Sequence, residues 1–387
     1  MADPEISAAP EIRIEQVSSK RDIKRFIRLA KAIYKDDPQW VEPLEMERLD
    51  LLLAKKNPWF EHAEARFWIA HKEGQPVGRI SAQVCQLVES EIEEGLGQFG
   101  MFECIEDKAV ADALFKTAED WLRSKGMKRV QGPFSLSVNT ECGLLVSGFE
   151  TPPSIMMGHA RPYYEDLVLG QGYAREKEMY AYLLYIGGGM NELVNNMKVL
   201  GERNKSLEMR RIDMKNYERE VATFFDIYNE AWSGNWGFLP FTESESRHAA
   251  KSMRPLIRDF MTHVCYHHGE PVAFMITLPD INRVLHQMNG RLLPFGWFKL
   301  VRWLFKRESV HVRVPLMGVL KKYQGTRLGA IMALWLIDVC QRGCAEHKGA
   351  WGELSWILED NLGMRKILEQ TGCDISKTYR IYDKSLL

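Results

Sequence analysis

The sequence has few cysteines, and they show no pairing pattern. Seven cysteines stand singly among 387 residues, and none forms a Cys-x-x-Cys pair. A disulfide scaffold and a cysteine-based zinc site are therefore not expected, and the odd count favours a reducing compartment such as the cytoplasm. We predict no metal site.

Long apolar runs and a strong net charge are also missing. We find no stretch of the roughly 18 apolar residues that crossing a bilayer requires, and the acidic segment 1–10 lacks the apolar core of a signal peptide. The formal net charge is −1, so no general attraction to nucleic acid is expected. These properties favour a cytoplasmic protein without a nucleic-acid partner.

What the sequence does contain is a regular alternation of strand and helix patterns that recurs after about 200 residues. The hairpin segment 74–77 matches 269–272, and Gly172, Lys177 and Tyr182 match Gly372, Lys377 and Tyr382. Hairpins combined with strand–helix alternation predict an α/β (α+β) fold of two tandem domains, each a twisted mixed sheet flanked by helices. We expect a loose tail over 1–11, domains over 12–186 and 206–387, and a linker over 187–205.

The most informative stretch lies near the C-terminus. A strand predicted over 309–319 runs into a basic, glycine-containing turn, and an apolar helix predicted over about 328–342 leaves that turn. Free backbone N–H groups gather at the positive end of a helix, so such a turn is a candidate anion site, most often for phosphate. Lys321, Lys322 and Arg327 would complement the charge.

At these residues the sequence resembles the GNAT superfamily of N-acetyltransferases. The pyrophosphate signature of that family, Gln/Arg-x-x-Gly-x-Gly/Ala, stands here over 324–329 with Arg327 at the central glycine. A later family segment resembles residues 361–373. The resemblance implies an acyl-CoA cofactor, either acetyl-CoA or a long-chain acyl-CoA. Its implied binding residues are Met317, Gly318, Val319, Leu320, Gln324, Gly325, Thr326, Arg327, Leu328, Gly329, Ala330 and Asn361.

The two halves differ at this turn. The first half has Ile-Glu-Asp-Lys over 105–108, and two acidic residues without a glycine make a poor phosphate site. We therefore expect the first half to be a degenerate copy that serves structure or acceptor binding. In the second half, Leu368 replaces the tyrosine that acts as general acid in many family members.

Acyl transfer to an amine needs a base that removes a proton from the ammonium. Glu353, Glu359 and His311 are the candidates, because they lie on or beside the strands next to the turn. Non-catalytic alternatives remain open for the two carboxylates: Glu353 would be exposed at a sheet edge, and Glu359 would cap the following helix.

An aromatic, Gly/Pro-broken loop follows the first helix of the second half, a region that covers the acceptor in this superfamily. Its candidate acceptor-binding residues are Trp232, Asn235, Trp236 and Phe238; a hydrophobic plug over the core is the alternative.

The second half contains an apolar insertion near 291–308, before the strand predicted over 309–319. Within residues 291–307, Lys299, Arg302 and Lys306 recur at helical spacing between Trp, Phe and Leu residues. This pattern favours a helix in a membrane interface over a core-covering helix, and predicts peripheral contact with the inner face of the membrane. A two-lobed chain with such an insertion also resembles bacterial ceramide synthases.

The leading hypothesis is an acyl-CoA-dependent N-acyltransferase of GNAT type, with a small-molecule or lipid amine as acceptor, hydrophobic or long-chain and sphingoid-like. Two alternatives stay open. One is an N-acetyltransferase of a small soluble amine or amino acid, and the other is a non-catalytic acyl-CoA-binding scaffold.

Overall fold

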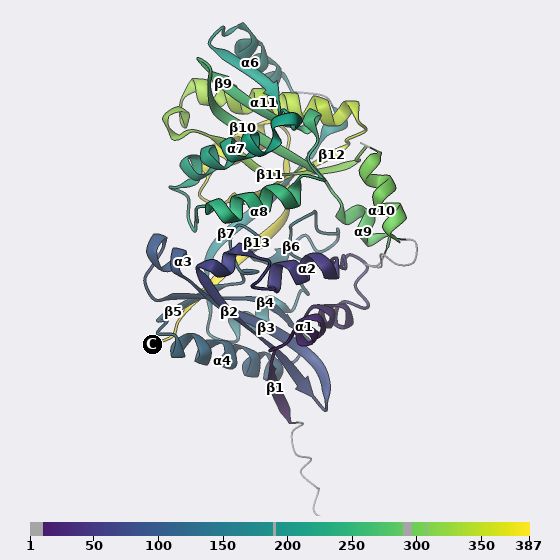
Figure 1. Cartoon of the computed structure of the whole chain (residues 1–387), viewed down its shortest axis with the longest axis vertical. Coiled ribbons are helices and arrows are strands. Elements are labelled where there is room, and N and C mark those ends of the chain that lie inside the picture. The colour runs from purple at the N-terminus through teal and green to yellow at the C-terminus, as the bar shows by residue number, and fades with distance from the viewer. Residues whose placement is uncertain (1–10, 189–190, 289–295, 307) are drawn as a thin grey trace, which may run out of the picture.

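The computed structural model describes residues 11–188, 191–288, 296–306 and 308–387. Both halves repeat one order of elements, with the earlier half below and the later half above in Figure 1. The predicted α/β fold of tandem mixed sheets flanked by helices is confirmed. The strands are β1 (Ile12–Gln16), β2 (Ala63–Lys72), β3 (Gln75–Cys85), β4 (Leu96–Cys104), β5 (Arg129–Gly132), β6 (Leu144–Ser147), β7 (Ala174–Tyr185), β8 (Leu207–Arg211), β9 (Thr262–His267), β10 (Glu270–Pro279), β11 (His311–Val319), β12 (Trp351–Leu358) and β13 (Asp374–Ser385).

Helices flank the strands in both halves, and several of them start with a side chain that caps the free N–H groups of the first turn. Ser19 and Thr242 each form a capping box. The helices are α1 (Lys20–Ile33), α2 (Glu45–Leu52), α3 (Gln86–Glu91), α4 (Lys108–Ser124), α5 (Tyr164–Leu169), α6 (Glu192–Arg203), α7 (Tyr217–Trp232), α8 (Glu243–Met253), α9 (Asn282–His286), α10 (Gly296–Phe305), α11 (Arg327–Glu346) and α12 (Leu362–Gln370).

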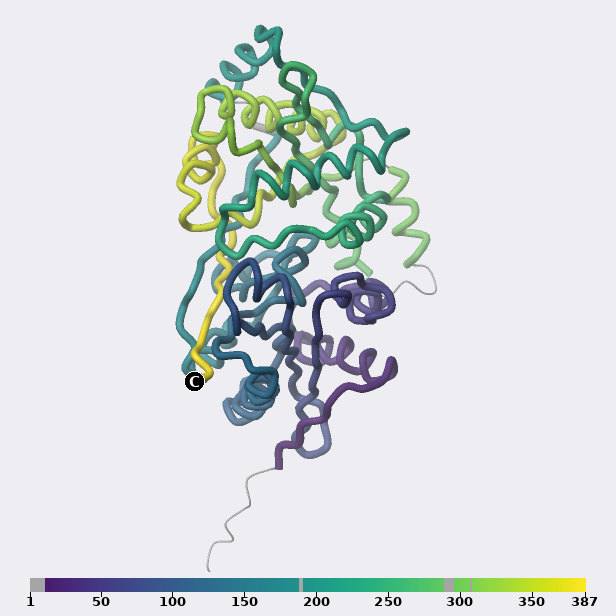
Figure 2. Tube along the Cα trace, turned by 60° about the vertical axis from the view of Figure 1, so that its left-hand side comes forward, coloured from purple at the N-terminus to yellow at the C-terminus, as the bar shows by residue number. Residues whose placement is uncertain are grey.

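The last strands of the two halves are exchanged. The sheet runs β1-β2-β3-β4-β5-β13-β7-β12-β11-β10-β9-β8, so β13 completes the first half beside β5, and β7 completes the second half beside β12. Figure 2 shows the yellow C-terminal strand descending into the lower, blue half. The mixed sheet of each half is therefore joined to the other in one continuous sheet through the antiparallel β7–β13 pair.

The segment 187–205, predicted as a linker, contains α6, which packs against α11. The division of the chain into domains at this point stays a prediction. The insertion predicted near 291–308 forms α10 between 296 and 305, whereas residues 291–295 and 307 lie outside the described residues.

Helix α11 is the core helix of the second half. By length and composition it is the single helix among the described residues that could cross a membrane, but 72% of its apolar window is buried inside the protein. Leu336, Met332 and Cys340 are almost completely buried against strands β9 and β10. Hydrophobic burial against the sheet fixes this helix, and thereby its N-terminus at the end of β11.

Candidate active site

Strands β11 and β12 separate in the middle of the second half. They pair in parallel from His311–Trp351 to Val314–Leu354, after which β11 continues beside β10 and β12 continues beside β7. From Met317 to Val319, the edge of β11 that faces β12 is therefore outside that ladder. Such an edge can pair with an extended ligand through backbone hydrogen bonds.

The turn after β11 is built for close backbone approach. Gly325 has φ +70°, and a Cβ on Gly329 would lie 2.1 Å from the carbonyl oxygen of Tyr323. Thr326 caps α11 by accepting a hydrogen bond from the Gly329 N–H at 3.0 Å. The Gln324 amide donates to the carbonyls of Val319 (2.8 Å) and Ala231 (2.9 Å), which holds the turn on β11 and α7.

The chemistry of this turn fits the phosphates of a CoA. Lys321, Lys322 and Arg327 are exposed around the start of the 20-residue helix α11. Leu328 and Ala330 are half-buried within its first turn. A positive helix end with three exposed cations beside it favours an anion. Arg327, which stands where the family has a glycine, is the first residue of the helix, so its side chain does not fill the turn.

The matching turn in the first half has no such capacity. The Asp107 carboxylate accepts the N–H groups of Ala109 (2.9 Å) and Val110 (3.3 Å) at the start of α4, and it pairs with Lys72 at 2.6 Å. The gap between β4 and β5 is also filled, because the Phe134 N–H donates to the Phe99 carbonyl at 2.8 Å. A carboxylate of the chain occupies this helix end, so a second anion is disfavoured there.

A large cavity of about 750 Å³ lies between the two halves. Apolar side chains from both halves dominate its wall, and all four residues of the predicted aromatic loop reach it: Trp232, Asn235, Trp236 and Phe238. The Trp232 indole N–H donates to the Met317 carbonyl at 2.9 Å, so this loop lies directly beside the separated part of β11. The cavity therefore reaches the point where β11 and β12 diverge, where Pro315, Leu316 and Trp356 also line it.

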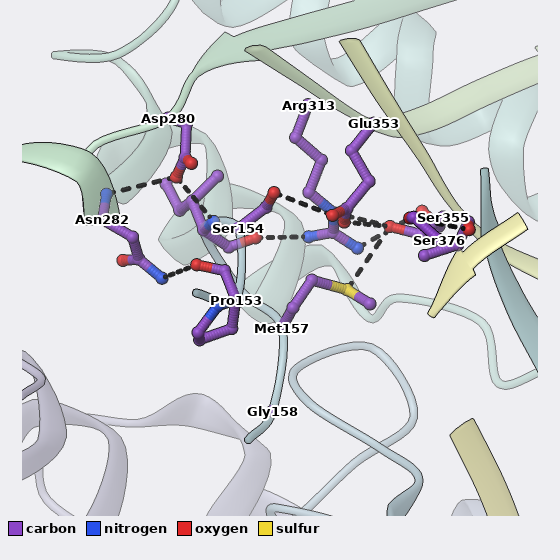
Figure 3. Close-up of polar contacts among 12 residues, drawn as sticks. Pro153, Ser154, Met157, Gly158, Asp280, Asn282, Arg313, Glu353, Ser355 and Ser376 are labelled. Atoms are coloured by element: carbon purple, nitrogen blue, oxygen red, sulfur yellow. Dashed lines mark hydrogen bonds and ion pairs between the residues drawn. The ribbon is translucent and has the colours of Figure 1, made fainter. Parts of the chain in front are cut away.

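Glu353 lies in a buried polar network at the base of this divergence (Figure 3). Its carboxylate accepts hydrogen bonds from the hydroxyls of Ser154 (2.8 Å) and Ser355 (2.9 Å). The guanidinium of Arg313 lies 3.8 Å from it and lines the cavity, which Glu353 itself does not. Arg313 therefore connects the Glu353 carboxylate to the cavity wall, and the predicted catalytic role of Glu353 stays a prediction.

The other two candidate bases lie away from the cavity wall. Glu359 pairs with Arg175 and accepts the Glu178 N–H at 3.0 Å. His311 begins β11, and burial lowers the pKa of its imidazole to about 4, so it is neutral at pH 7. Asn361 caps α12 by accepting the Met364 N–H at 3.2 Å. Their predicted roles in catalysis and cofactor binding stay predictions.

Sequence reasoning missed the residues that tie the halves together at this point. Arg313 is fully buried and donates to the Ile155 carbonyl (2.8 Å) and to the Ser355 hydroxyl (3.0 Å). The Asp280 carboxylate accepts the Ile155 N–H at 2.9 Å, and burial raises its pKa to about 6. The sequence signal for this network was Arg313, an arginine within the otherwise largely apolar strand predicted over 309–319.

Comparison with known proteins gives a consistent result, although no family model matches the chain. The chain is 40% identical over 382 residues to "Bacterial ceramide synthase" of Caulobacter vibrioides, covering 98% of this chain and 99% of that protein. It is 39% identical to "Protein YghO" of Escherichia coli, covering 95% and 94%.

Among solved structures, a tandem GNAT protein from the clavulanic acid biosynthesis pathway aligns with a TM-score of 0.57 at 10% identity, over 97% of this chain and 99% of that one. That likeness concerns the fold. Taken with the full-length relatives, it shows that this chain belongs to the GNAT-fold N-acyltransferase family that includes the Caulobacter ceramide synthase and YghO.

Proposed function

We propose that this N-acyltransferase uses acyl-CoA to acylate a hydrophobic, long-chain primary amine of sphingoid type. The observation that carries the proposal is the cavity of about 750 Å³ between the halves, which is mostly apolar and reaches the divergence of β11 and β12. This volume is near the upper end for small-molecule sites. A small polar amine would leave most of the apolar wall without a partner.

The donor would lie along the turn and the separated strand. Backbone N–H groups of the α11 N-terminus, with Lys321, Lys322 and Arg327, would hold the phosphates. The part of β11 outside the β12 ladder, from Met317 to Val319, and Leu320 after it would pair with the extended arm of the cofactor. Bound acyl-CoA supplies a thioester, and the protein residues orient it and exclude water from the cavity.

Two observations support a lipid acceptor. A relative that matches this chain over nearly its full length carries the name ceramide synthase. In addition, the aromatic loop and the first-half residues Trp40, Val41 and Leu44 line one shared cavity, which has room for an alkyl chain that extends away from the reacting end.

Helix α10 would bring the protein to a membrane, on the cytoplasmic face. Trp297, Phe298 and Phe305 are 51%, 56% and 82% exposed on this helix. Lys299, Arg302 and Lys306 are exposed beside them, which suits anionic headgroups. Leu304 of the same helix lines the cavity, so the helix that would contact the membrane also forms part of the cavity wall.

The reaction is tested by measuring free-CoA release with palmitoyl-CoA and acetyl-CoA over an amine panel that includes sphinganine, octadecylamine and ethanolamine. We expect release only with the long-chain amines. Equal rates with ethanolamine would contradict a long-chain acceptor, and no release with any pair would contradict the enzyme.

Membrane contact is tested separately by flotation with vesicles that contain anionic lipid. We expect Phe298→Glu/Phe305→Glu to reduce flotation strongly, whereas Leu362→Glu, an exposed apolar residue on α12, serves as the matched control. Equal flotation of both variants and the wild type would exclude α10 as the contact.

A further inference from the structure

The first half contributes an ionic group to the wall of the cavity. Arg48 and Glu141 form an ion pair at 2.9 Å, and their side chains keep 27% and 22% of their accessible surface while lining the cavity. Arg79 and Glu103, 3.4 Å apart, line it as well. These four residues, which we term the ionic wall, stand in a cavity that is otherwise mainly apolar.

The members of the ionic wall lie close enough to influence one another. The pKa of Arg48 is raised, above all by the charge of Glu141 and more weakly by Glu47 and Glu103. Burial raises the pKa of Glu103, and the charge of Glu141 adds to this effect. Two carboxylates therefore share one region of the wall, and keeping charges in an apolar cavity costs free energy unless a partner compensates them.

Glu141 is held rigidly by a loop of the first half that docks on the second. Within this loop the Ser135 N–H donates to the Glu141 carbonyl at 2.7 Å. The loop reaches α7, where the Tyr228 hydroxyl donates to the Asn139 amide oxygen at 2.9 Å. The Asn139 amide in turn donates to the Leu239 carbonyl at 3.0 Å. The Glu141 carboxylate is thus preorganised at the junction of the halves.

The same carboxylate lies beside the segment that binds the Arg313 network. Glu141 Oε1 would be 3.3 Å from a Cβ on Gly158. Met157, the preceding residue, contacts the Ser355 hydroxyl through its sulfur at 3.4 Å (Figure 3). Ser355 is a hydrogen-bond partner of both Arg313 and Glu353. Residues 157 and 158 therefore connect Glu141, at one end of the ionic wall, to the network at the base of the divergence of β11 and β12.

We propose that Glu141 and Glu103 form the binding site for the acceptor's head group, a primary ammonium with neighbouring hydroxyls, so that the first half selects the acceptor while the second half holds the donor. This inference rests on the proposed function. Glu47 also lines the cavity beside Arg48, so three carboxylates face two guanidiniums there. An ammonium at Glu141 and Glu103 would balance the remaining negative charge, and the guanidiniums of Arg48 and Arg79 would donate to the hydroxyls. The alkyl chain would then follow the apolar wall.

The site is tested by binding rather than turnover, using octadecylamine and octadecan-1-ol as probes in the same detergent. Their affinities can be followed by the change in tryptophan fluorescence as the alkyl chain displaces water, since Trp232, Trp236 and Trp356 line the cavity. The wild type should bind the ammonium about tenfold or more tightly than the alcohol, and Glu141→Gln and Glu103→Gln should each remove most of that preference. Asp112→Asn, which alters an exposed ion pair on α4, is the matched control and should keep it.

The test of the head-group site does not depend on any single variant being folded. A wild type that binds the alcohol as tightly as the amine would overturn the head-group site even if neither glutamine variant folds. Retained preference in both folded variants would overturn it too. Thermal stabilisation by palmitoyl-CoA is measured alongside: it should be unchanged in the variants, and its absence in the wild type would refute the donor site while leaving the ammonium preference as a separate result.

Discussion

The N-termini of α4 and α11 occupy equivalent places in the two halves, yet their surroundings are opposite. At α4 the Asp107 carboxylate takes two backbone N–H groups and pairs with Lys72. At α11 the neutral Thr326 hydroxyl takes one, and three exposed cations stand nearby. One aspartate in place of a threonine cap thus satisfies the helix end internally, whereas the threonine leaves it available for an anion.

The strands next to these helices differ in the same way. Between β4 and β5 the backbone at Phe134 closes the gap, and a Cβ on Gly100 would lie 1.7 Å from the Phe134 carbonyl oxygen. Between β11 and β12 the corresponding edge stays open toward the cavity. A duplicated fold can therefore keep its architecture in both copies while one copy gives up ligand binding for packing.

The largest effect is expected from closing the turn of the second half. In Gly329→Val the added side chain would meet the Tyr323 carbonyl, displacing the backbone that approaches the donor. We expect loss of acyl-CoA-dependent stabilisation and a fall in activity of about 100-fold or more. Gly363→Ala on α12, where nothing lies within 4 Å of the added Cβ, is the control. Normal acyl-CoA binding by Gly329→Val would remove the distinction between the halves.

The next effect concerns the buried pair at the junction. Arg313→Met would leave Glu353 buried without its cation and should lower the free energy of unfolding by about 3–5 kcal/mol. The double variant Arg313→Met/Glu353→Met should recover part of this loss, since it removes both charges. Chemical denaturation of the wild type, Arg313→Met, Glu353→Met and the double variant tests the coupling. Additive losses would show that the two residues do not act as a pair.

A smaller effect should appear in the pH dependence of stability. Burial raises the pKa of Asp280 to about 6 in the folded protein, above its value in an unfolded chain, so the folded state holds this proton more tightly. The contribution of Asp280 is then most favourable at low pH and is lost as pH rises from about 4 to 6, by about 2–3 kcal/mol. The difference in unfolding free energy between wild type and Asp280→Asn should change by this amount across that range; a constant difference would contradict it.

The smallest effect is expected in the first half. Asp107→Ala removes the cap of α4 and should cost about 1 kcal/mol of stability. Acyl-CoA binding should stay unchanged, because this helix end is not expected to bind the donor. Differential scanning fluorimetry with and without palmitoyl-CoA measures both quantities. A weakened response to palmitoyl-CoA would assign donor binding to the first half as well.

Local patterns predicted much of the fold. The hairpin expected at 269–272 is observed between β9 and β10, and the helix expected from about 328 begins at Arg327, since turn chemistry and apolar periodicity are local signals. Helix α8 was missed although Thr242 and Glu245 form a capping box, because the helix has few apolar residues. The exchange of β7 and β13 could not be predicted, since either strand has a pattern that suits either sheet edge.

For the candidate site, too, the sequence predicted the local features and missed the contacts between distant segments. The turn over 324–329 and the aromatic loop are contiguous in sequence, and both were found there. Arg313, Asp280 and Glu141 belong to contacts between segments more than 90 residues apart, such as Arg313 with Ile155, and one sequence does not record such pairings. Single charged residues in apolar strands are the signal that deserved more weight.

The exchanged strands also bear on how the chain reaches its native state. The sheet of the first half lacks its neighbour for β5 until residues 374–385 are in place. During synthesis the first half therefore keeps an unprotected strand edge until residues 374–385 have left the ribosome. Removing β13 from the C-terminus should therefore leave the first half unable to fold, although most of that half is encoded some 200 residues earlier.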